Sequence, residues 1–141
     1  MNHVSGIYAA LLTPFHEDQS IHKEALQQLV ARMIDNGVHG LFALGTNGEF
    51  HTLTPQEKYE VATIVLKEAK GKIPVMLGVG GNYTEEAIQL AKGFEQLGAT
   101  MFLCHQTKAN WRITLKTLLT RPKYRFSYTT FPQKQEFVLI R

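Results

Sequence analysis

The chain has 141 residues, of which 44% are hydrophobic and 19% charged, and its formal net charge is +3. This length and balance suit one globular domain with a single core, and the sequence contains no run of about 18 apolar residues of the kind that spans a membrane. Cys104 is the only cysteine, which excludes a disulfide framework, and residues 1–6 lack the basic and apolar regions of a secretory signal, so we expect a cytoplasmic protein.

The first part of the chain predicts a strand, a helix and a second strand. Residues 7–12 form an apolar run that stops at Thr13-Pro14, as a strand does where proline cannot donate to the next ladder bond. From Ser20, a predicted N-cap, apolar residues recur at three- and four-residue spacing as far as Asn36-Gly37, which indicates an amphipathic helix with a left-handed stop. Residues 40–44 are continuously apolar, which is typical of a parallel strand covered on both faces.

The same alternation continues to about residue 104. Thr54-Pro55-Gln56-Glu57 combines an N-cap, a proline at the first helical position and a glutamate three residues after the cap, and predicts a helix that ends near Gly71. Residues 73–77 indicate a third strand, Asn82 a cap for a third helix that Gly98 closes, and residues 99–104 the start of a fourth strand.

Strands that start about every thirty residues and alternate with helices predict an α/β fold with a parallel sheet. Two architectures remain open on this pattern, a doubly wound open sheet and a (β/α)₈ barrel. In both, ligands bind at the carboxyl ends of the strands, where the sequence places Thr13, Thr46-Asn47 and residues 78–81. The turn over residues 44–50 is therefore a candidate anion site, although its two glycines also fit a turn with no ligand.

Composition changes abruptly near residue 100. Residues 105–141 hold eight of the fifteen basic residues and only one of the twelve acidic ones, a net charge of +7, so residues 1–104 carry −4. All eleven glycines lie at or before Gly98. This shift predicts a boundary between residues 1–104 and residues 105–141.

Four sequence blocks stand out along the chain: Gly6-Ile7-Tyr8-Ala9-Ala10-Leu11-Leu12-Thr13-Pro14-Phe15, Gly37-Val38-His39-Gly40-Leu41, Gly45-Thr46-Asn47-Gly48-Glu49 with Leu53-Thr54, and Ile73-Pro74-Val75 with Gly78-Val79-Gly80. In order and spacing they resemble the dihydrodipicolinate synthase/N-acetylneuraminate lyase family over about residues 4–100. The resemblance implies that residues 1–104 are the N-terminal part, about three and a half βα units, of a (β/α)₈ barrel. It also implies a class I aldolase, a homotetramer at full length, in which a lysine forms a Schiff base with pyruvate or another 2-keto acid.

The resemblance assigns roles to the glycine turn. It implies that the main-chain N–H groups of Thr46, Asn47 and Gly48 hold the keto acid's carboxylate, and that the Thr46 hydroxyl is catalytic in a proton relay with a later tyrosine; the alternative is that this hydroxyl only caps the turn. Ala10 would form a wall beside the pyruvate methyl, although core packing alone also explains it, and Glu49 is expected to tie the loop. Asn47 stands where dihydrodipicolinate synthases tend to carry a second threonine, so the aldehyde partner is left open. No metal and no cofactor are expected.

Nothing after Phe102 matches the family as written. Back-translation, reading from the third base of each codon into the next, allows family-like strings from residues 112–121 and 121–132, including a Tyr-Asn-Ile-Pro segment. The hypothesis that follows is a deletion or frame error near residues 101–104 and an aberrant, irregular tail over 105–141. The family's lysine strand would lie beyond residue 141, so the chain is expected to be inactive alone.

Two other readings remain. Trp111-Arg112, residues 123–126 and Tyr128 interleave bases with aromatic rings, as in single-stranded nucleic-acid binders; the frame hypothesis explains the same tail with no nucleic-acid or membrane partner. A half barrel acting as a subunit would need an exposed sheet edge to pair with another chain.

Overall fold

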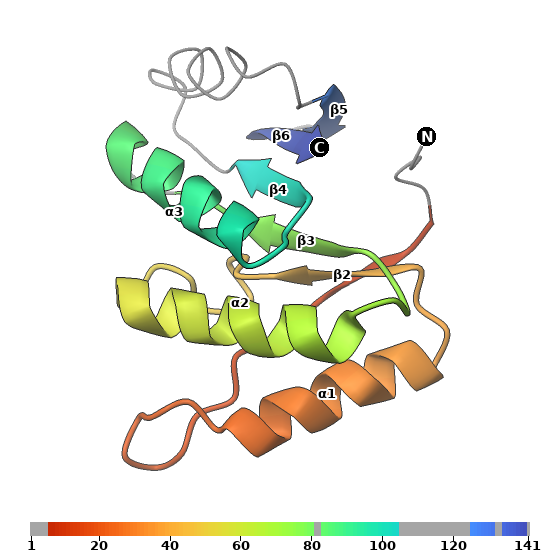
Figure 1. Ribbon diagram of the computed structural model, residues 1–141, viewed down its shortest axis with the longest axis vertical. Helices are drawn as coiled ribbons and strands as arrows, with labels where there is room; N and C mark the ends of the chain where they lie inside the picture. The colour runs from red at the N-terminus through yellow and green to blue at the C-terminus, as the bar shows by residue number, and fades with distance from the viewer. Residues whose placement is uncertain (1–5, 81–82, 105–124, 132–133, 141) are drawn as a thin grey trace. The chain divides into compact units, whose positions relative to one another are not determined.

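The computed structural model describes residues 6–80, 83–104, 125–131 and 134–140 (Figure 1). The chain divides into two compact units, Met1–Met76 and Leu77–Arg141. The elements in chain order are β1 (Tyr8–Ala10), α1 (Lys23–Asp35), β2 (Gly40–Ala43), α2 (Pro55–Ala69), β3 (Val75–Gly78), α3 (Thr84–Gln96), β4 (Met101–Cys104), β5 (Arg125–Phe131) and β6 (Lys134–Ile140).

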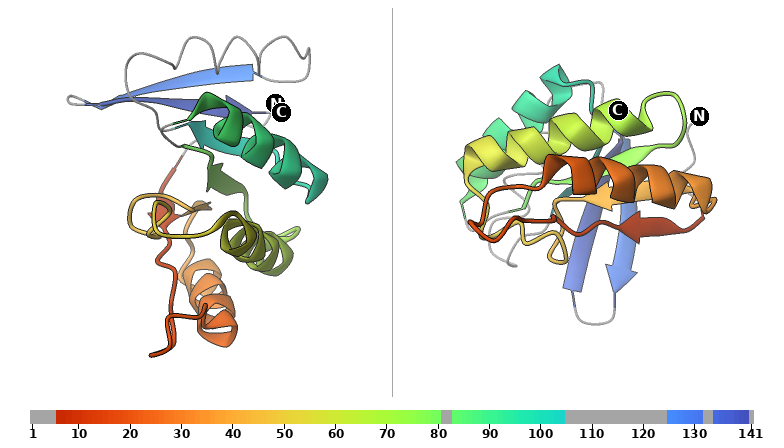
Figure 2. Two further views of the ribbon diagram at one scale, coloured as in Figure 1. Left: turned by 90° about the vertical axis from the view of Figure 1, so that its left-hand side faces the viewer. Right: turned by 90° about the horizontal axis from the view of Figure 1, so that it is seen from below.

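The first unit is built from two strand-helix repeats. β1 pairs with β2 in parallel, so that Tyr8 lies opposite Gly40 and Ala10 opposite Phe42. The Leu41 N–H donates to the Pro74 carbonyl at 3.0 Å, just before β3 begins. The helices α1 and α2 lie side by side, and both contact β2 (Figures 1 and 2). The predicted parallel sheet with crossover helices is therefore present.

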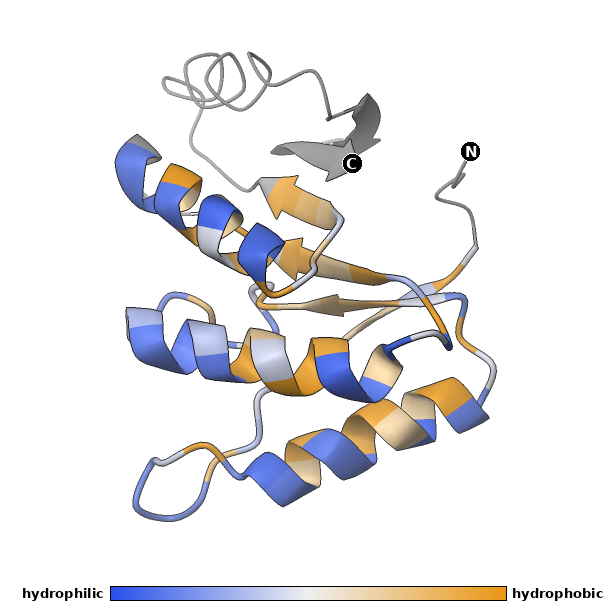
Figure 3. Cartoon of the chain, viewed as in Figure 1, coloured by the Kyte–Doolittle hydropathy of each residue, from blue (hydrophilic) through white to orange (hydrophobic). Residues whose placement is uncertain are grey.

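The core of this unit comes from one stripe of each helix and from β2. Figure 3 shows α1 and α2 with a hydrophobic stripe and a hydrophilic one, as their three- and four-residue spacing predicts. β2 is buried more evenly, as expected of a parallel strand. The buried apolar residues of these elements are Leu26, Val30, Leu41, Ala43, Val61, Ala62, Val65 and Ala69.

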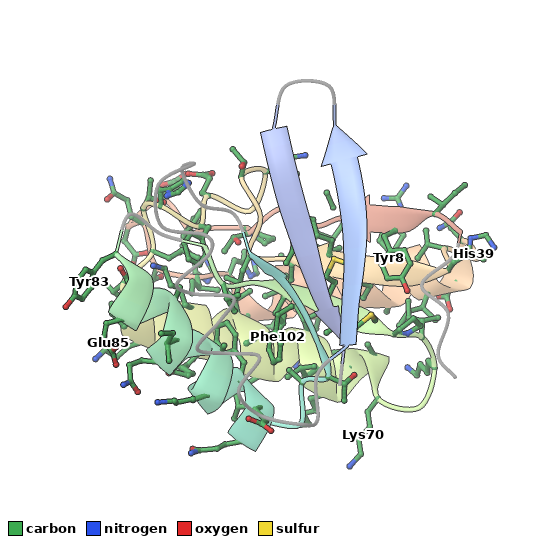
Figure 4. All side chains as sticks on the ribbon, turned by 90° about the horizontal axis from the view of Figure 1, so that it is seen from above. Tyr8, His39, Lys70, Tyr83, Glu85 and Phe102 are labelled. Carbon is green, nitrogen blue, oxygen red and sulfur yellow. The ribbon has the colours of Figure 1, made fainter. Side chains whose placement is uncertain are left out.

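The amino end of the sheet is held by close packing rather than by glycine freedom alone. His39 Nδ1 accepts the Ile7 N–H at 3.0 Å, and a Cβ on Gly40 would collide with the Tyr8 ring. Figure 4 shows Tyr8 and His39 next to each other at this end. Burial raises the pKa of the Tyr8 hydroxyl.

Most predicted helix ends are confirmed, and the N-cap predicted for α1 is corrected. Thr54 forms the full capping box with Glu57, and Gly37, Gly71 and Gly98 all have positive φ at the ends of helices. The cap expected at Ser20 is wrong, because its N–H and hydroxyl both bond to Asp18 Oδ1, and the helix starts after His22, whose Nδ1 accepts the Ala25 N–H.

The second unit contains the end of β3, α3, β4 and a hairpin. The Val79 N–H donates to the Leu103 carbonyl at 3.0 Å, which places the end of β3 beside β4. Phe94 and Phe102 are buried, and Figure 4 marks Phe102. The N-cap position of α3 is Tyr83, without a side-chain bond, rather than the expected Asn82, which lies outside the described residues.

The expectation of an irregular tail is wrong for two segments. β5 and β6 form an antiparallel hairpin, and β6 also pairs antiparallel with β4, so that Met101 lies opposite Ile140. The reason is composition, since aromatic and β-branched residues are frequent in both segments and favour strands. The expectations for residues 105–124, Trp111-Arg112 and Lys123-Tyr124 included, fall outside the described residues.

In the described part of the chain, no helix combines the length and the hydrophobicity needed to cross a bilayer.

Candidate functional site

The turn that follows β2 is held in an unusual backbone shape. Leu44 at its start has φ 59° and Glu49 near its end has φ 54°. Residues other than glycine rarely adopt this left-handed region. Leu44 is 2% exposed, so the core fixes its position while the backbone carries the strain. Strained residues of this kind cluster at binding and catalytic sites, and here two of them frame the residues in question.

Three hydrogen bonds close the turn on itself. The N–H groups of Gly48 and Phe50 donate to the Gly45 carbonyl at 3.1 and 3.3 Å, and the Glu49 N–H donates to the Thr46 carbonyl at 3.1 Å. The N–H groups of Thr46 and Asn47 have no acceptor among the described residues. Both residues are exposed, so two adjacent N–H groups that the turn does not use follow a strand's carboxyl end, which is an arrangement that suits an anion.

A buried hydrogen bond fastens the turn to the first strand segment. The Thr13 hydroxyl donates to the Gly48 carbonyl at 2.7 Å, and Thr13 is 6% exposed. A Cβ on Gly48 would lie 3.1 Å from the Leu11 carbonyl oxygen and 3.4 Å from Thr13 Oγ1. Gly48 is therefore a glycine because the β1 connection passes directly against it, not because of its φ.

The site residues predicted from the sequence occupy two neighbouring strands. Ala10 ends β1, is exposed and lies opposite Phe42 of β2. Thr46 and Asn47 are exposed on the turn, and Gly48 is buried beneath them. The Gly48 N–H already donates within the turn, so it can reach a ligand only as a shared donor. Gly78 ends β3 in the second unit and residues 79 and 80 follow it, while residue 81 lies outside the described residues.

The expected tie through Glu49 exists, but through its backbone. The Glu49 carbonyl accepts both the Thr52 N–H at 2.9 Å and the Thr52 hydroxyl at 2.8 Å. Further hydrogen bonds follow at the start of α2, where the Glu57 carboxylate accepts the Thr54 N–H and the Thr54 hydroxyl, each at 2.7 Å. These bonds hold the pKa of Glu57 below its ordinary value.

Sequence reasoning missed two residues that support the turn. Thr13 was placed at the correct edge of the sheet but was given no bond to the turn. Lys58 was expected on a helix face, and it does lie on α2, but it is 5% exposed and its Nζ lies 4.0 Å above the centre of the Phe50 ring. From the sequence, a lysine directly after a capping box is expected to be exposed to solvent. Only the contact with Phe50 shows that Lys58 is buried.

Taken together, the turn offers two oriented N–H donors and one exposed hydroxyl on a strained, buried frame. Such a group can bind a carboxylate, and the hydroxyl can pass a proton to or from a bound molecule. Two described lysines of this unit have defined contacts: Lys23 pairs with Glu60, and Lys58 packs on Phe50 of the turn.

Comparison with known proteins gives a consistent family match. A model of the dihydrodipicolinate synthetase family matches residues 3–104. A 4-hydroxy-tetrahydrodipicolinate synthase from Marinobacter nauticus is 44% identical over 96 residues, which are 68% of this chain and 33% of that protein. The chain thus spans about a third of the length of this curated relative.

Solved structures give the same answer for the fold. The dihydrodipicolinate synthase of Aquifex aeolicus has a TM-score of 0.66 and 38% identity, covering 72% of this chain and 33% of that one. A prophage protein of the dihydrodipicolinic acid synthase family from E. coli K12, solved in complex with pyruvate, has a TM-score of 0.77 and 28% identity, covering 83% of this chain and 41% of that one. The fold is therefore the N-terminal part of a (β/α)₈ barrel, as expected.

Proposed function

Because this chain belongs to the dihydrodipicolinate synthetase family, we propose that its glycine turn binds the carboxylate of pyruvate or another 2-keto acid, as part of a lyase of the class I aldolase type. The observation that carries the proposal is the pair of N–H groups on the exposed residues Thr46 and Asn47, which donate to no acceptor among the described residues. The pyruvate complex of the E. coli K12 relative supports the ligand class.

The remaining residues take supporting roles in this proposal. The Thr46 hydroxyl acts as a proton relay, Ala10 offers a small side chain beside the ligand, and Thr13 keeps the donors in place through the Gly48 carbonyl. Preformed donors of this kind lose little free energy to reorganisation when the anion binds. Binding is nevertheless weak, since two N–H groups on an exposed turn compete with water for the carboxylate.

Pyruvate titration followed by amide NMR tests the anion site. We expect the largest shifts at Thr46 and Asn47 and a smaller one at Gly48, whose N–H is shared. Pyruvamide is the matched control, because it keeps the ketone and lacks the negative charge. An unchanged spectrum at high millimolar pyruvate, or equal shifts with pyruvamide, would refute the site.

We further propose that the 141-residue chain does not form the Schiff base by itself. That step requires an amine that is nucleophilic near neutral pH and reaches the ligand. The ion pair with Glu60 raises the pKa of Lys23 and keeps it protonated, and Lys58 lies over Phe50. Lys67 and Lys92 lie on helices, and Lys70 and Lys72 follow one, so no described lysine ends a strand beside the turn.

Borohydride reduction with labelled pyruvate tests this second proposal separately. The 141-residue chain should stay unlabelled, while a frame-corrected, full-length version should trap one keto acid per chain. Stoichiometric labelling of the short chain would contradict the proposal. In that event Lys58→Arg decides whether the buried lysine is the nucleophile, because arginine keeps the positive charge and cannot form the imine.

The change of reading frame near residues 101–104 stays a proposal as well. It is supported by the family match, which ends at residue 104, and by the charge and glycine shift that begins there. Reading the gene's DNA across the codons for residues 98–141 tests it directly. A homologous sequence that continues in the present frame would refute it.

A further inference from the structure

The connection from β1 to α1 forms a short two-stranded loop, here called the histidine loop, residues 14–22. Phe15 and Ile21 make an antiparallel bridge. The bridge is flanked by two 2.8 Å hydrogen bonds, from the His16 N–H to the Ser20 carbonyl and from the His22 N–H to the Pro14 carbonyl. The backbone of this loop is therefore fixed on both sides of the bridge.

Alternation along the bridge decides which side chains meet. Successive residues of an extended segment point to opposite faces. Ile21 is 5% exposed and faces the core, so its neighbour His22 and the diagonal residue His16 share the opposite face. Their rings stack with centroids 4.0 Å apart and an interplanar angle of 17°.

Glu24 completes the group from the first turn of α1. Its Oε2 lies 3.5 Å from His22 Nδ1. One ligand atom from each of His16, His22 and Glu24 falls within 4.8 Å of the other two. In a tetrahedral zinc site with bonds of about 2.0–2.1 Å, neighbouring ligand atoms lie about 3.3 Å apart. The Glu24–His22 pair already has nearly this separation. The exposed His16 ring would have to turn out of its stack on His22, because two parallel rings cannot both direct a ring nitrogen at one ion.

We propose that His16, His22 and Glu24 form a binding site for a divalent transition metal, with Zn²⁺ as the best-fitting ion. Two imidazoles and one carboxylate are borderline ligands that favour zinc over calcium or magnesium, which take oxygen ligands. Three protein ligands leave a fourth position for water. The site lies on the β1–α1 connection and does not depend on the keto-acid proposal.

The charges around the group suit a cation. Asp18 lies in the same loop, and its Oδ1 accepts the Ser20 N–H and hydroxyl at 3.0 and 2.6 Å. Lys23, the one base next to the site in sequence, has its ammonium group against Glu60 of α2 and so does not neutralise Glu24. Residues 14–22 contain two acidic residues, Glu17 and Asp18, and no lysine or arginine.

A metal bound at His22 Nδ1 would replace the hydrogen bond by which His22 caps α1. That nitrogen accepts the Ala25 N–H at 3.3 Å, which is long for a hydrogen bond. A metal at Nδ1 would replace this weak cap by a link between the loop and the helix. Zinc that binds only the folded chain should therefore stabilise it, by an amount that rises with the logarithm of free zinc above the Kd.

The test uses the full chain, freed of metal, in a Cys104→Ser background that removes the one thiol able to compete for zinc. Zn²⁺ affinity is measured against a chromophoric chelator, and histidine ring signals are followed by NMR. We expect one zinc per chain, with shifted rings for His16 and His22 and unshifted rings for His39 and His51. His16→Asn and Glu24→Gln each remove a ligand and leave the His22 cap intact. Each should weaken binding by more than the about 10- to 100-fold that loss of an outer partner costs.

His51→Asn is the matched control, because His51 is another exposed histidine of the same unit and lies outside the cluster. It should bind zinc as the parent does. Equal zinc affinity in His16→Asn and the parent, or zinc-induced shifts confined to other histidines, would overturn the site.

Discussion

Two connections in the first unit do the same structural task by different means. The glycine turn leads from β2 to α2 and the histidine loop leads from β1 to α1, both away from the carboxyl end of a strand. The glycine turn is fixed from beneath by a buried bond to Thr13 and by strained residues at both ends. The histidine loop is fixed by exposed bonds between residues close in sequence. Burial, not the number of bonds, should therefore decide which connection is sensitive to substitution.

The largest expected effect is that of Thr13→Val. Valine has the same shape but leaves the buried Gly48 carbonyl without its donor, which costs about 1–3 kcal/mol of unfolding free energy. Urea denaturation measures this loss. Thr52→Val is the matched control, since the Glu49 carbonyl that Thr52 serves is exposed and also accepts the Thr52 N–H. Equal losses in the two variants would show that burial does not separate the two bonds.

Gly48→Ala tests the same anchor by crowding it. The new methyl group would lie 3.1 Å from the Leu11 carbonyl oxygen, so the β1 connection must move by a few tenths of an ångström, at a cost of about 1 kcal/mol. NMR should show changed signals at Leu11 and Thr13. Gly71→Ala is the contrast, because that glycine has φ +74° and open space around it, so it should lose stability without changing those signals.

The helix caps that end the two connections should respond in opposite directions. Thr54→Ala removes the hydroxyl half of a capping box but keeps the N–H that donates to Glu57, and should cost about 1 kcal/mol. His22→Asn replaces a long imidazole cap by a preferred one and should leave stability unchanged or raise it by a few tenths of a kcal/mol. Thermal denaturation of both variants in metal-free buffer checks this. A larger loss in His22→Asn than in Thr54→Ala would contradict it.

The smallest expected effect concerns pH, and here the two connections should agree. The pKa of Asp18 and that of Glu57 are both lowered by hydrogen bonds, from ordinary values of 3.8 and 4.5. A lowered folded-state pKa contributes stability that is present above the ordinary value and lost as the pH falls through the folded-state one. Melting temperatures of Asp18→Asn and Glu57→Gln should thus approach that of the parent below about pH 4. A difference that grows toward acid would reverse the sign and refute the assignment.

The sequence predicted the elements whose signals are local. The capping box at Thr54, the helix stops at Gly37, Gly71 and Gly98, and a parallel sheet are all confirmed. The caps and stops depend on residues within one turn, and the parallel sheet follows from the alternation of strands with helices.

What the sequence did not predict depends on contacts between distant residues or on competition within a loop. Ser20 fits an N-cap by residue type, but Asp18 takes its hydroxyl and the Phe15–Ile21 bridge extends the chain past it. Lys58 follows a capping box as a solvated residue would, and only Phe50 shows that it is buried. In the site, the turn could be located from its glycines and strand, whereas the Thr13 anchor needed the pairing of β1 with β2.

The Thr13–Gly48 bond also has a consequence for the order of folding. Its partners are 35 residues apart in the chain, so the bond closes a long loop whose entropy must be lost before the bond can form. The turn's own hydrogen bonds are local and can appear early, but the buried anchor can form only after β1 has reached β2. The arrangement of the Thr46 and Asn47 N–H groups is then a late product of folding. A refolding chain should acquire secondary structure before it acquires the anion site that we propose.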